Sequence, residues 1–368
     1  EGGGGRFEAE DEGVTVKVLS RHFDRGAEVL ADLLANASFP TEAVDRARTE
    51  VLGEITFAEE DPDTMAIDGF REAVYGPHPY ARPKRGRTET VERITREDVV
   101  AHHREWYRPN NAILVVCGDV DGAMVREVVE RRFGSWERAE VPPLTCPAAE
   151  TARGEVSLDA DTEQAIVYVG HVGVRRVDPD FDALLVMDHV LGTGSGFTDR
   201  VSKKVRDELG LAYSCYATIS SSSGEEPGRF TAYVACQPEN ETQAVEALTA
   251  EIRRFVEEGP TEQELRDAKD YLVASRAFEF ETTAEMASYW LEAEQIGLPA
   301  DELSTFAGRI EAVTREEVVR VARAHLHLDD AAVVRVGPAR KEASTGLAIG
   351  AKSVDAQGRT WELAEWEA

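Results

Sequence analysis

The sequence has no long hydrophobic run, and its charge is strongly one-sided. No apolar stretch approaches the roughly 20 residues that a helix needs to cross a bilayer, so we expect no membrane span. Only 41 lysines and arginines stand against 70 aspartates and glutamates, which gives a net charge of −29. This balance argues against a nucleic-acid-binding protein, because phosphate contacts require basic patches. It allows either a solvated acidic surface or a cleft that attracts basic peptides.

Cysteine is also scarce. The four cysteines form no Cys-x-x-Cys pair, which excludes the usual zinc knuckles and dithiol redox motifs; they are Cys117, Cys146, Cys215 and Cys236. Cys117 and Cys236 lie in apolar, strand-like runs, and we expect both to be reduced core residues. Cysteines that are few and unpaired indicate a reducing compartment, so we predict a cytoplasmic location.

The hydrophobic patterns that are present predict an α+β chain of two domains. Strands are predicted at 6–20, 112–118, 155–158, 164–170, 212–222, 228–236 and 331–336. Helices are predicted at 24–36, 41–60, 62–74, 88–94, 96–107, 123–133, 181–191, 198–208, 241–257, 261–280, 284–296, 301–310 and 315–325. The first domain covers 1–138, a proline-containing linker 139–154, the second domain 155–338 and a tail 339–368.

Short motifs recur in the two halves at a nearly constant shift. Gly5-Arg6-Phe7 recurs at Gly228, Pro40-Thr41-Glu42 at Pro260, and Thr95-Arg96-Glu97 at Thr314. The same helical pattern follows each of the last two pairs, so the chain is predicted to be a tandem duplication of one α+β unit. The second copy begins with residues 155–227, for which the first copy has no counterpart. We therefore expect residues upstream of Glu1, or a partner chain, to supply the missing part.

The most specific stretch of the sequence is Gly192–Tyr216. A glycine-rich turn leads into the predicted helix 198–208, Gly210 ends that helix as a left-handed cap, and a strand follows. Arg206 and Tyr213 lie on either side of this tight turn and could donate hydrogen bonds to a peptide carbonyl or its developing oxyanion. The spacing alone also allows a capping arginine and a half-buried tyrosine.

Several runs together resemble one known family. They are Glu60-Asp61-Pro62, Tyr75-Gly76-Pro77-His78-Pro79, Trp106-Tyr107-Arg108-Pro109-Asn110-Asn111 and Arg206-Asp207-Glu208-Leu209-Gly210-Leu211-Ala212-Tyr213. From Gly5 to about Pro338 the chain is similar to the pitrilysin/insulinase family of zinc peptidases, which includes the mitochondrial processing peptidases. The resemblance implies the inverted-zincin fold, in which duplicated α+β half-shells of antiparallel and mixed sheets, packed with helices, surround a closed chamber.

The resemblance also implies a zinc site built from a His-x-x-Glu-His helix and a distal glutamate. The distal glutamate corresponds to Glu54, and the arginine–tyrosine pair that holds the substrate corresponds to Arg206 and Tyr213. Two imidazoles and one carboxylate leave a zinc position open for the attacking water. The implied cofactor is therefore zinc, and the implied substrate is a peptide.

Two features depart from this pattern. None of the eight histidines lies in a His-x-x-Glu-His motif. Residues 185–189 resemble a degenerate repeat mate of the motif, with Leu185 in place of the first histidine, and the repeat shift places the true motif roughly thirty residues before Glu1. Ala47 stands where the family often has an acidic residue. The repeat mate of Glu54 is Ala274, so the second copy lacks a matching carboxylate.

Three functions are compatible with these features. The first is a zinc metalloendopeptidase that hydrolyses short or unfolded peptides in an enclosed chamber. The second is a non-catalytic, substrate-binding subunit of a heterodimeric peptidase. The third is a structural subunit, like the core subunits of respiratory complexes, although Arg206 and Tyr213 argue against it. We expect a homodimer, or a heterodimer with a related subunit, and no nucleic-acid or membrane partner.

Overall fold

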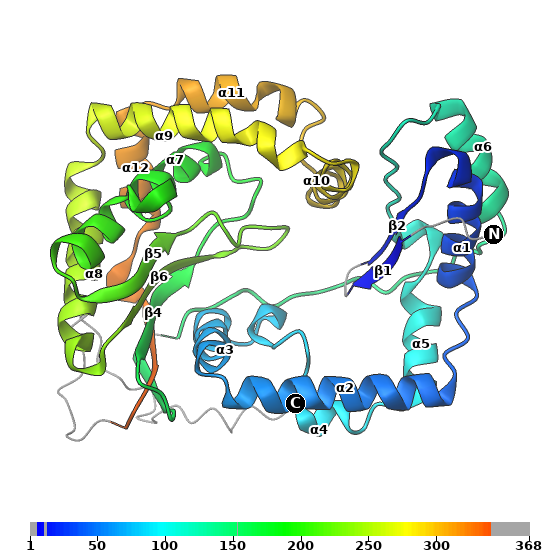
Figure 1. Ribbon diagram of the computed structural model, residues 1–368, viewed down its shortest axis with the longest axis horizontal. Coiled ribbons are helices and arrows are strands. Elements are labelled where there is room, and N and C mark those ends of the chain that lie inside the picture. The colour runs from blue at the N-terminus through cyan, green and yellow to red at the C-terminus, as the bar shows by residue number, and fades with distance from the viewer. Residues whose placement is uncertain (1–5, 11–12, 153, 340–368) are drawn as a thin grey trace. The chain divides into compact units, whose positions relative to one another are not determined.

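A computed structural model describes residues 6–10, 13–152 and 154–339 (Figure 1). The chain divides into two compact units. Unit 1 comprises Glu1–Leu52, Thr88–Thr145 and Arg276–Leu298, and unit 2 comprises Gly53–Arg87, Cys146–Ser275 and Pro299–Ala368. Each unit consists of three separate segments, whereas the domains predicted from the sequence are continuous. The predicted domain boundaries therefore stay a prediction. Within the described residues, no helix combines the length and apolar character that crossing a bilayer demands.

Unit 2 is built on a mixed, five-stranded sheet with the order β3-β7-β4-β6-β5. Its strands are β3 (Gly154–Asp159), β4 (Ala165–Val172), β5 (Ala212–Thr218), β6 (Arg229–Cys236) and β7 (Ala332–Gly337). Only the β3–β7 pair is parallel, and the other three pairs are antiparallel. Because β4 and β7 are buried on both faces, their sequences are mostly apolar rather than alternating, with His171 and Arg335 as the buried exceptions.

Helices cover both faces of this sheet (Figure 1). One face packs against α7 (Phe181–Leu191) and α8 (Glu241–Glu258), which α9 (Glu262–Ser275), α11 (Glu302–Ala312) and α12 (Arg315–His325) support. The opposite face packs against α3 (Pro62–Tyr75), where the Phe70 ring stacks on Tyr168 of β4. Gly170 permits this closeness, since an added Cβ would lie 1.9 Å from the Phe230 carbonyl oxygen and 2.6 Å from the Phe70 ring.

Unit 1 is mainly helical. It contains α1 (Phe23–Ala35), most of α2 (Thr41–Glu60), α4 (Thr88–Val91), α5 (Arg96–Trp106), α6 (Gly122–Phe133) and α10 (Thr283–Ile296). Asp24 fastens α1 to α6, because its carboxylate accepts hydrogen bonds from Arg131 and Arg132 at 2.8–2.9 Å. These guanidinium groups hold the pKa of Asp24 well below its usual range.

The structure corrects two strand predictions in unit 1. The predicted single strand 6–20 is instead an antiparallel hairpin of β1 (Arg6–Glu10) and β2 (Gly13–Lys17). The predicted strand 112–118 is wrong, because this segment pairs with no strand of the described chain. Ile113 and Leu114 are consequently 44% and 46% exposed, and Cys117 is half-buried rather than a core residue.

The order of elements agrees with the predicted internal repeat. The series α1, α2, α3, α4, α5 and 112–118 is matched by α8, α9, α10, α11, α12 and β7. Arg96 donates hydrogen bonds to the carbonyls of Ser38 and Phe39 just before α2, and Arg315 donates to those of Glu258 and Pro260 just before α9. Thr95 and Thr314 each begin the following helix with a capping box.

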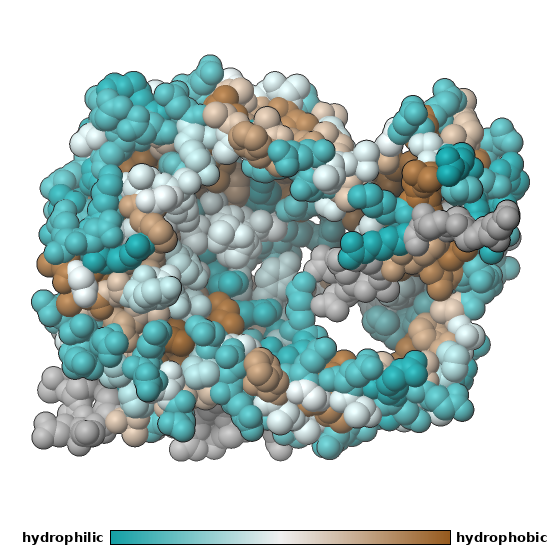
Figure 2. Space-filling view, viewed as in Figure 1, coloured by the Kyte–Doolittle hydropathy of each residue, from teal (hydrophilic) through white to brown (hydrophobic). Residues whose placement is uncertain are grey.

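Apart from 198–208, which is described below, the other helix predictions agree with the structure within a few residues, with one clear exception at a C-terminus. The predicted helix 261–280 ends as α9 at Ser275 and continues as a 3-10 turn over Arg276–Phe280. On the face drawn in Figure 2, hydrophilic side chains predominate, as the excess of acidic residues leads one to expect.

Buried His171 makes the stability of unit 2 depend on pH. This β4 side chain is 5% exposed; Nδ1 lies 2.8 Å from the Val172 carbonyl oxygen, and Nε2 accepts the His327 backbone N–H at 3.0 Å. Burial lowers the pKa of His171 from 6.5 to about 4. Between these values the unfolded chain binds a proton that the folded chain does not, so stability falls as the pH falls.

We predict that lowering the pH from 7.5 to 5.5 removes on the order of 1 kcal/mol of His171-dependent unfolding free energy. Urea unfolding of wild type and His171→Gln at both values measures this. The variant should be less stable at pH 7.5 but should lose less stability on acidification. Equal losses in the two proteins would exclude His171 as the source.

Candidate functional site

Arg206 lies on a helix that is wider than an α-helix. The predicted α-helix 198–208 is instead a 3-10 turn at Ser195–Phe197 followed by a π-helix at Ser202–Glu208. Its end is set by Gly210, whose φ of +62° confirms the predicted left-handed cap. π-Helical turns occur frequently at functional sites, because the wider turn redirects side chains.

Tyr213 lies on a β-bulge directly after that turn. Ala212 pairs with Cys236 and Ser214 pairs with Ala235, so Tyr213 has no partner on β6. A bulge changes the direction of the extra side chain, and Tyr213 is 83% exposed. The sequence allowed a half-buried tyrosine here, and the structure excludes it. The predicted strand 212–222 also ends earlier, at Thr218.

The side chain of Arg206 rests on an aromatic ring. Its guanidinium carbon lies 3.7 Å from the centroid of the Phe197 ring, which is within the range of a cation–π contact. The nearest carboxylate is that of Asp207, at 3.8 Å from Nε, and Nη1 is shielded from water without a hydrogen-bond partner among the described residues. Arg206 therefore keeps an unused donor.

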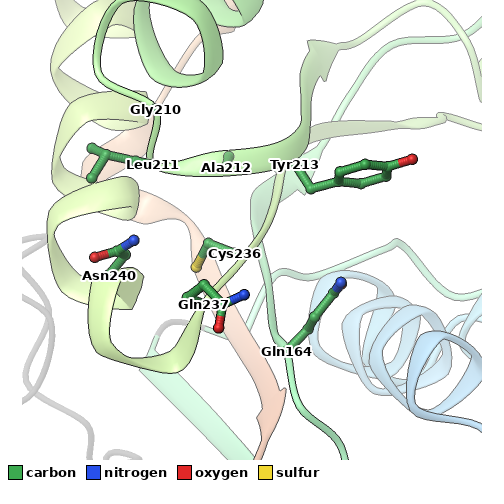
Figure 3. A pocket seen from close by; sticks show the side chains of 8 residues that line it. All are labelled: Gln164, Gly210, Leu211, Ala212, Tyr213, Cys236, Gln237 and Asn240. Carbon is green, nitrogen blue, oxygen red and sulfur yellow. The ribbon is translucent and has the colours of Figure 1, made fainter.

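A shallow depression of about 190 Å³ borders Tyr213 (Figure 3). Its polar lining consists of the amides of Gln164, Gln237 and Asn240 and carries no charged group. In Figure 3 the Tyr213 ring extends away from the Leu211 and Asn240 side chains. The depression could hold a small neutral side chain, and Tyr213 stands free at its margin.

Glu54, the predicted zinc ligand, is on α2. It is exposed, and no described residue forms a hydrogen bond or ion pair with it. A carboxylate in this condition can serve as one oxygen ligand of a metal ion. The structure shows no contact between Glu54 and Arg206 or Tyr213, and no described histidine completes a metal-binding group with it.

The degenerate motif of the second copy serves a structural purpose. Asp188, on α7, is 1% exposed and accepts hydrogen bonds from Thr218 Oγ1, Ile219 N, Ser220 N and Ser220 Oγ at 2.6–2.9 Å. Burial raises the pKa of Asp188, whereas these four donors favour its carboxylate. His189 stacks on Tyr271 of α9 with ring centroids 4.6 Å apart. With Leu185 and Ala274 also in place, the described residues of this copy do not complete the ligand set that the resemblance implies.

One other group of side chains has metal-ligand chemistry. The ligand atoms of Asp178, Asp180 and His325 lie within 4.8 Å of one another. Asp180 is already engaged, since it accepts hydrogen bonds from both Arg320 Nη groups and lies 2.8 Å from His325 Nε2. Hydrogen bonds from Arg320 and His325 lower the pKa of Asp180 to about 2 against the opposing effect of burial. The cluster is best explained as an ion-pair network between α12 and the start of α7.

Sequence reasoning missed the contribution of Phe197. The only signal was the glycine-rich context Gly192–Gly196, which gives the loop its unusual backbone. Gly192 approaches β5 so closely that an added Cβ would lie 2.2 Å from the Ala217 amide nitrogen. The contact of Phe197 with Arg206 depends on that folded loop and leaves no spacing pattern in the sequence.

The chain is similar to proteins of one peptidase group. A family profile described as "Peptidase M16 inactive domain" matches residues 93–272. The non-peptidase homolog YmxG of Helicobacter pylori is 26% identical over 336 residues, which cover 90% of this chain and 76% of the relative. An uncharacterized zinc protease of Streptomyces coelicolor is 29% identical over 314 residues, or 83% and 68% of the two chains.

Solved structures show the same fold. The M16 inactive domain of Pseudomonas fluorescens matches with a TM-score of 0.84 at 21% identity, over 91% of this chain and 81% of that one. A Helicobacter pylori protease matches with a TM-score of 0.81 at 19% identity. These matches confirm the predicted α+β fold, and at this identity they establish the fold alone.

We predict that Asp188→Ala removes about 3 kcal/mol of unfolding free energy, because it leaves several buried donors without an acceptor. Denaturant unfolding of the variant measures the loss. Asp161→Ala, at an exposed turn, is the control and should stay within about 0.5 kcal/mol of wild type. A loss of similar size in both variants would mean that Asp188 does not hold the loop.

Proposed function

We propose, from the premise that the chain belongs to the M16 peptidase family, that it forms the substrate-holding part of a zinc metallopeptidase acting on short or unfolded peptides. The carrying observation is the placement of Arg206 and Tyr213. A π-helix presents Arg206 and a β-bulge presents Tyr213, on either side of the left-handed turn at Gly210. Two consecutive backbone irregularities support a function for this pair.

The proposed role of the pair is to bind the substrate backbone. Arg206 has an unused donor, and the exposed Tyr213 hydroxyl can donate as well. Donors already in place before the substrate arrives can stabilise a carbonyl whose oxygen gains negative charge during peptide hydrolysis. They also orient an extended peptide, which a folded protein could not present in the same way.

Glu54 would supply one ligand of the zinc ion. An exposed carboxylate without an ion pair fits that role, whereas the two imidazoles would come from a His-x-x-Glu-His helix outside the printed sequence. Zinc bound in such a site lowers the pKa of a water molecule and makes it a nucleophile. Within this chain, the part of Glu54 is to hold the ion, and that of Arg206 and Tyr213 is to hold the peptide.

The unpaired segment 112–118 supports an external origin for that helix. Its repeat mate β7 pairs with β3 and β4, and α7 packs nearby on the same sheet. We propose that two further strands pair with 112–118 and bring a helix equivalent to α7. This segment would belong to the same protein or to a partner subunit, as a homodimer or a heterodimer would allow. The exposed Ile113 and Leu114 would then be covered.

A non-catalytic subunit that binds substrate for a separate zinc-bearing chain is the second candidate. Ala47, in place of an acidic residue, favours it, and so does the similarity to a relative named a non-peptidase homolog. Both candidates share the peptide-binding role of Arg206 and Tyr213. A cytoplasmic location is part of either proposal and is supported by four cysteines that are all free.

In the complete protein or complex, Glu54→Gln should lower zinc affinity at least 100-fold, because it removes a direct ligand. Zinc content and cleavage of an unstructured peptide measure the effect. Glu50→Gln, one turn earlier on the exposed side of α2, should behave like wild type. Full cleavage by Glu54→Gln at unchanged zinc content would remove Glu54 from the site. A wild-type preparation that binds peptide without zinc or cleavage would favour the second candidate.

Arg206→Ala should weaken peptide binding by about tenfold, the value of one hydrogen bond from a charged donor. If the protein cleaves peptides, kcat/KM should fall by about 10²–10³. Fluorescence anisotropy and initial rates measure these two quantities. Lys203→Ala removes an equal charge from the same helix and should change neither by more than about twofold. Equal effects of the two variants would show that only net charge matters.

A further inference from the structure

We propose that Phe197 is a positioning residue that orients the guanidinium of Arg206 for peptide binding. The inference rests on the proposed function and adds to it a residue that neither the repeat nor the spacing of motifs indicates. Phe197 lies in the turn before the π-helix, nine residues ahead of Arg206, and its ring lies under the guanidinium at 3.7 Å.

The backbone of Phe197 adopts a conformation that ordinary residues avoid. Its φ is +62°, next to Gly196 at +67°. A bulky residue in this region is strained, because its Cβ crowds the following carbonyl. Such strain persists only when the surrounding structure compensates for it, and it gathers at functional sites.

Core packing does not account for the strain. Phe197 is 52% exposed, so its ring gains only part of the free energy that full burial of a phenylalanine provides. Phe39 offers a comparison, because it too has a positive φ, of +44°. Its carbonyl accepts the Arg96 Nε hydrogen bond at 2.6 Å and its ring packs edge-on against His103, so a structural reason is visible. For Phe197, the described interaction is the contact with Arg206.

Stacking leaves the guanidinium free to bind a ligand. The N–H groups of an arginine lie in the plane of the guanidinium, so a ring beneath that plane orients them without using any of them. Arg176 and Arg200 also stack on phenylalanines, at 4.1 and 5.2 Å. Each of these, however, donates hydrogen bonds to a carboxylate: Arg176 Nη2 to Glu302, and Arg200 Nε and Nη2 to Glu264, although Arg200 Nη1 also lacks a partner.

Arg206 lacks such a carboxylate clamp. Asp207 is 3.8 Å from Nε, too far for a hydrogen bond, and Nη1 has no acceptor although it is shielded from water. An unsatisfied donor is costly, and a peptide carbonyl could satisfy it on binding. The ring therefore fixes the direction of the guanidinium without using any of its donors.

Two substitutions separate the ring from the backbone strain. Phe197→Tyr keeps both, whereas Phe197→Asn removes the ring and suits a left-handed conformation better. We expect Phe197→Asn to weaken binding of a fluorescein-labelled, unstructured peptide containing lysine and arginine by about 3- to 30-fold, the worth of one cation–π contact. Its Tm should equal or exceed that of wild type. Phe197→Tyr should bind within about twofold of wild type.

A double-mutant comparison tests whether Phe197 acts through Arg206. In an Arg206→Ala background, adding Phe197→Asn should cause no further loss of peptide affinity. A residue that merely supports the loop would lower the Tm and reduce affinity equally in both backgrounds. Phe278→Asn, at a 69% exposed phenylalanine on another turn, is the matched control and should leave affinity unchanged.

The outcomes distinguish this inference from the proposed function. If Arg206→Ala binds the peptide as well as wild type does, or if wild type binds none, the proposed function fails and the inference fails with it. If Arg206→Ala weakens binding and Phe197→Asn does not, the inference alone is overturned. Additive losses in the double mutant would also overturn it. Should Phe197→Asn not fold, Phe197→Gly, which suits the same φ, replaces it in the comparison.

Discussion

The candidate site depends on one buried carboxylate. The side chain of Asp188 holds residues 218–220 at the end of β5, while its backbone carbonyl accepts hydrogen bonds from Gly192 and Thr193 at 2.9 Å. A single residue of α7 thus ties both ends of the segment that carries Phe197, Arg206 and Tyr213. A buried carboxylate can hold these segments together only when hydrogen-bond donors surround it, because an unpaired buried charge is strongly destabilising.

Within that clamped segment, strain and irregularity are concentrated. A positive φ at Phe197, a π-helix around Arg206 and a bulge at Tyr213 follow one another within seventeen residues. Each departs from the regular structure that local sequence preferences favour. The sheet and α7 hold this segment at both ends. Their packing compensates for the backbone irregularities and keeps Phe197, Arg206 and Tyr213 in a prearranged position.

The two copies have diverged in how they use equivalent positions. In the second copy, α7 is a structural anchor through Asp188 and the His189–Tyr271 stack. In the first copy, Glu54 remains an exposed carboxylate where its mate is Ala274. Duplication allows such a difference, since equivalent positions of two copies can change independently. Arg206 and Tyr213, the pair proposed to bind peptide, belong to the second copy.

Most helices were predictable from the sequence, because their signals are local. Thr95, Thr314 and Asp61 cap helices whose starts are marked by the residues that immediately follow. Gly210 was identified as a left-handed cap on the same grounds. Strand predictions were less accurate where pairing decides the outcome, as at 112–118, which has a strand-like sequence but no neighbour in the described chain.

The sequence by itself therefore determined the repeat, most of the helices and the identity of Glu54, Arg206 and Tyr213 as candidates. Tertiary structure alone decided how those candidates are presented. The bulge at Tyr213 arises from register with β6, the wide helix at Arg206 from hydrogen bonds closed around Gly210, and the Phe197 contact from a loop pressed against Ala217. Register, ring stacking and close backbone approach depend on residues distant in sequence, so no local pattern encodes them.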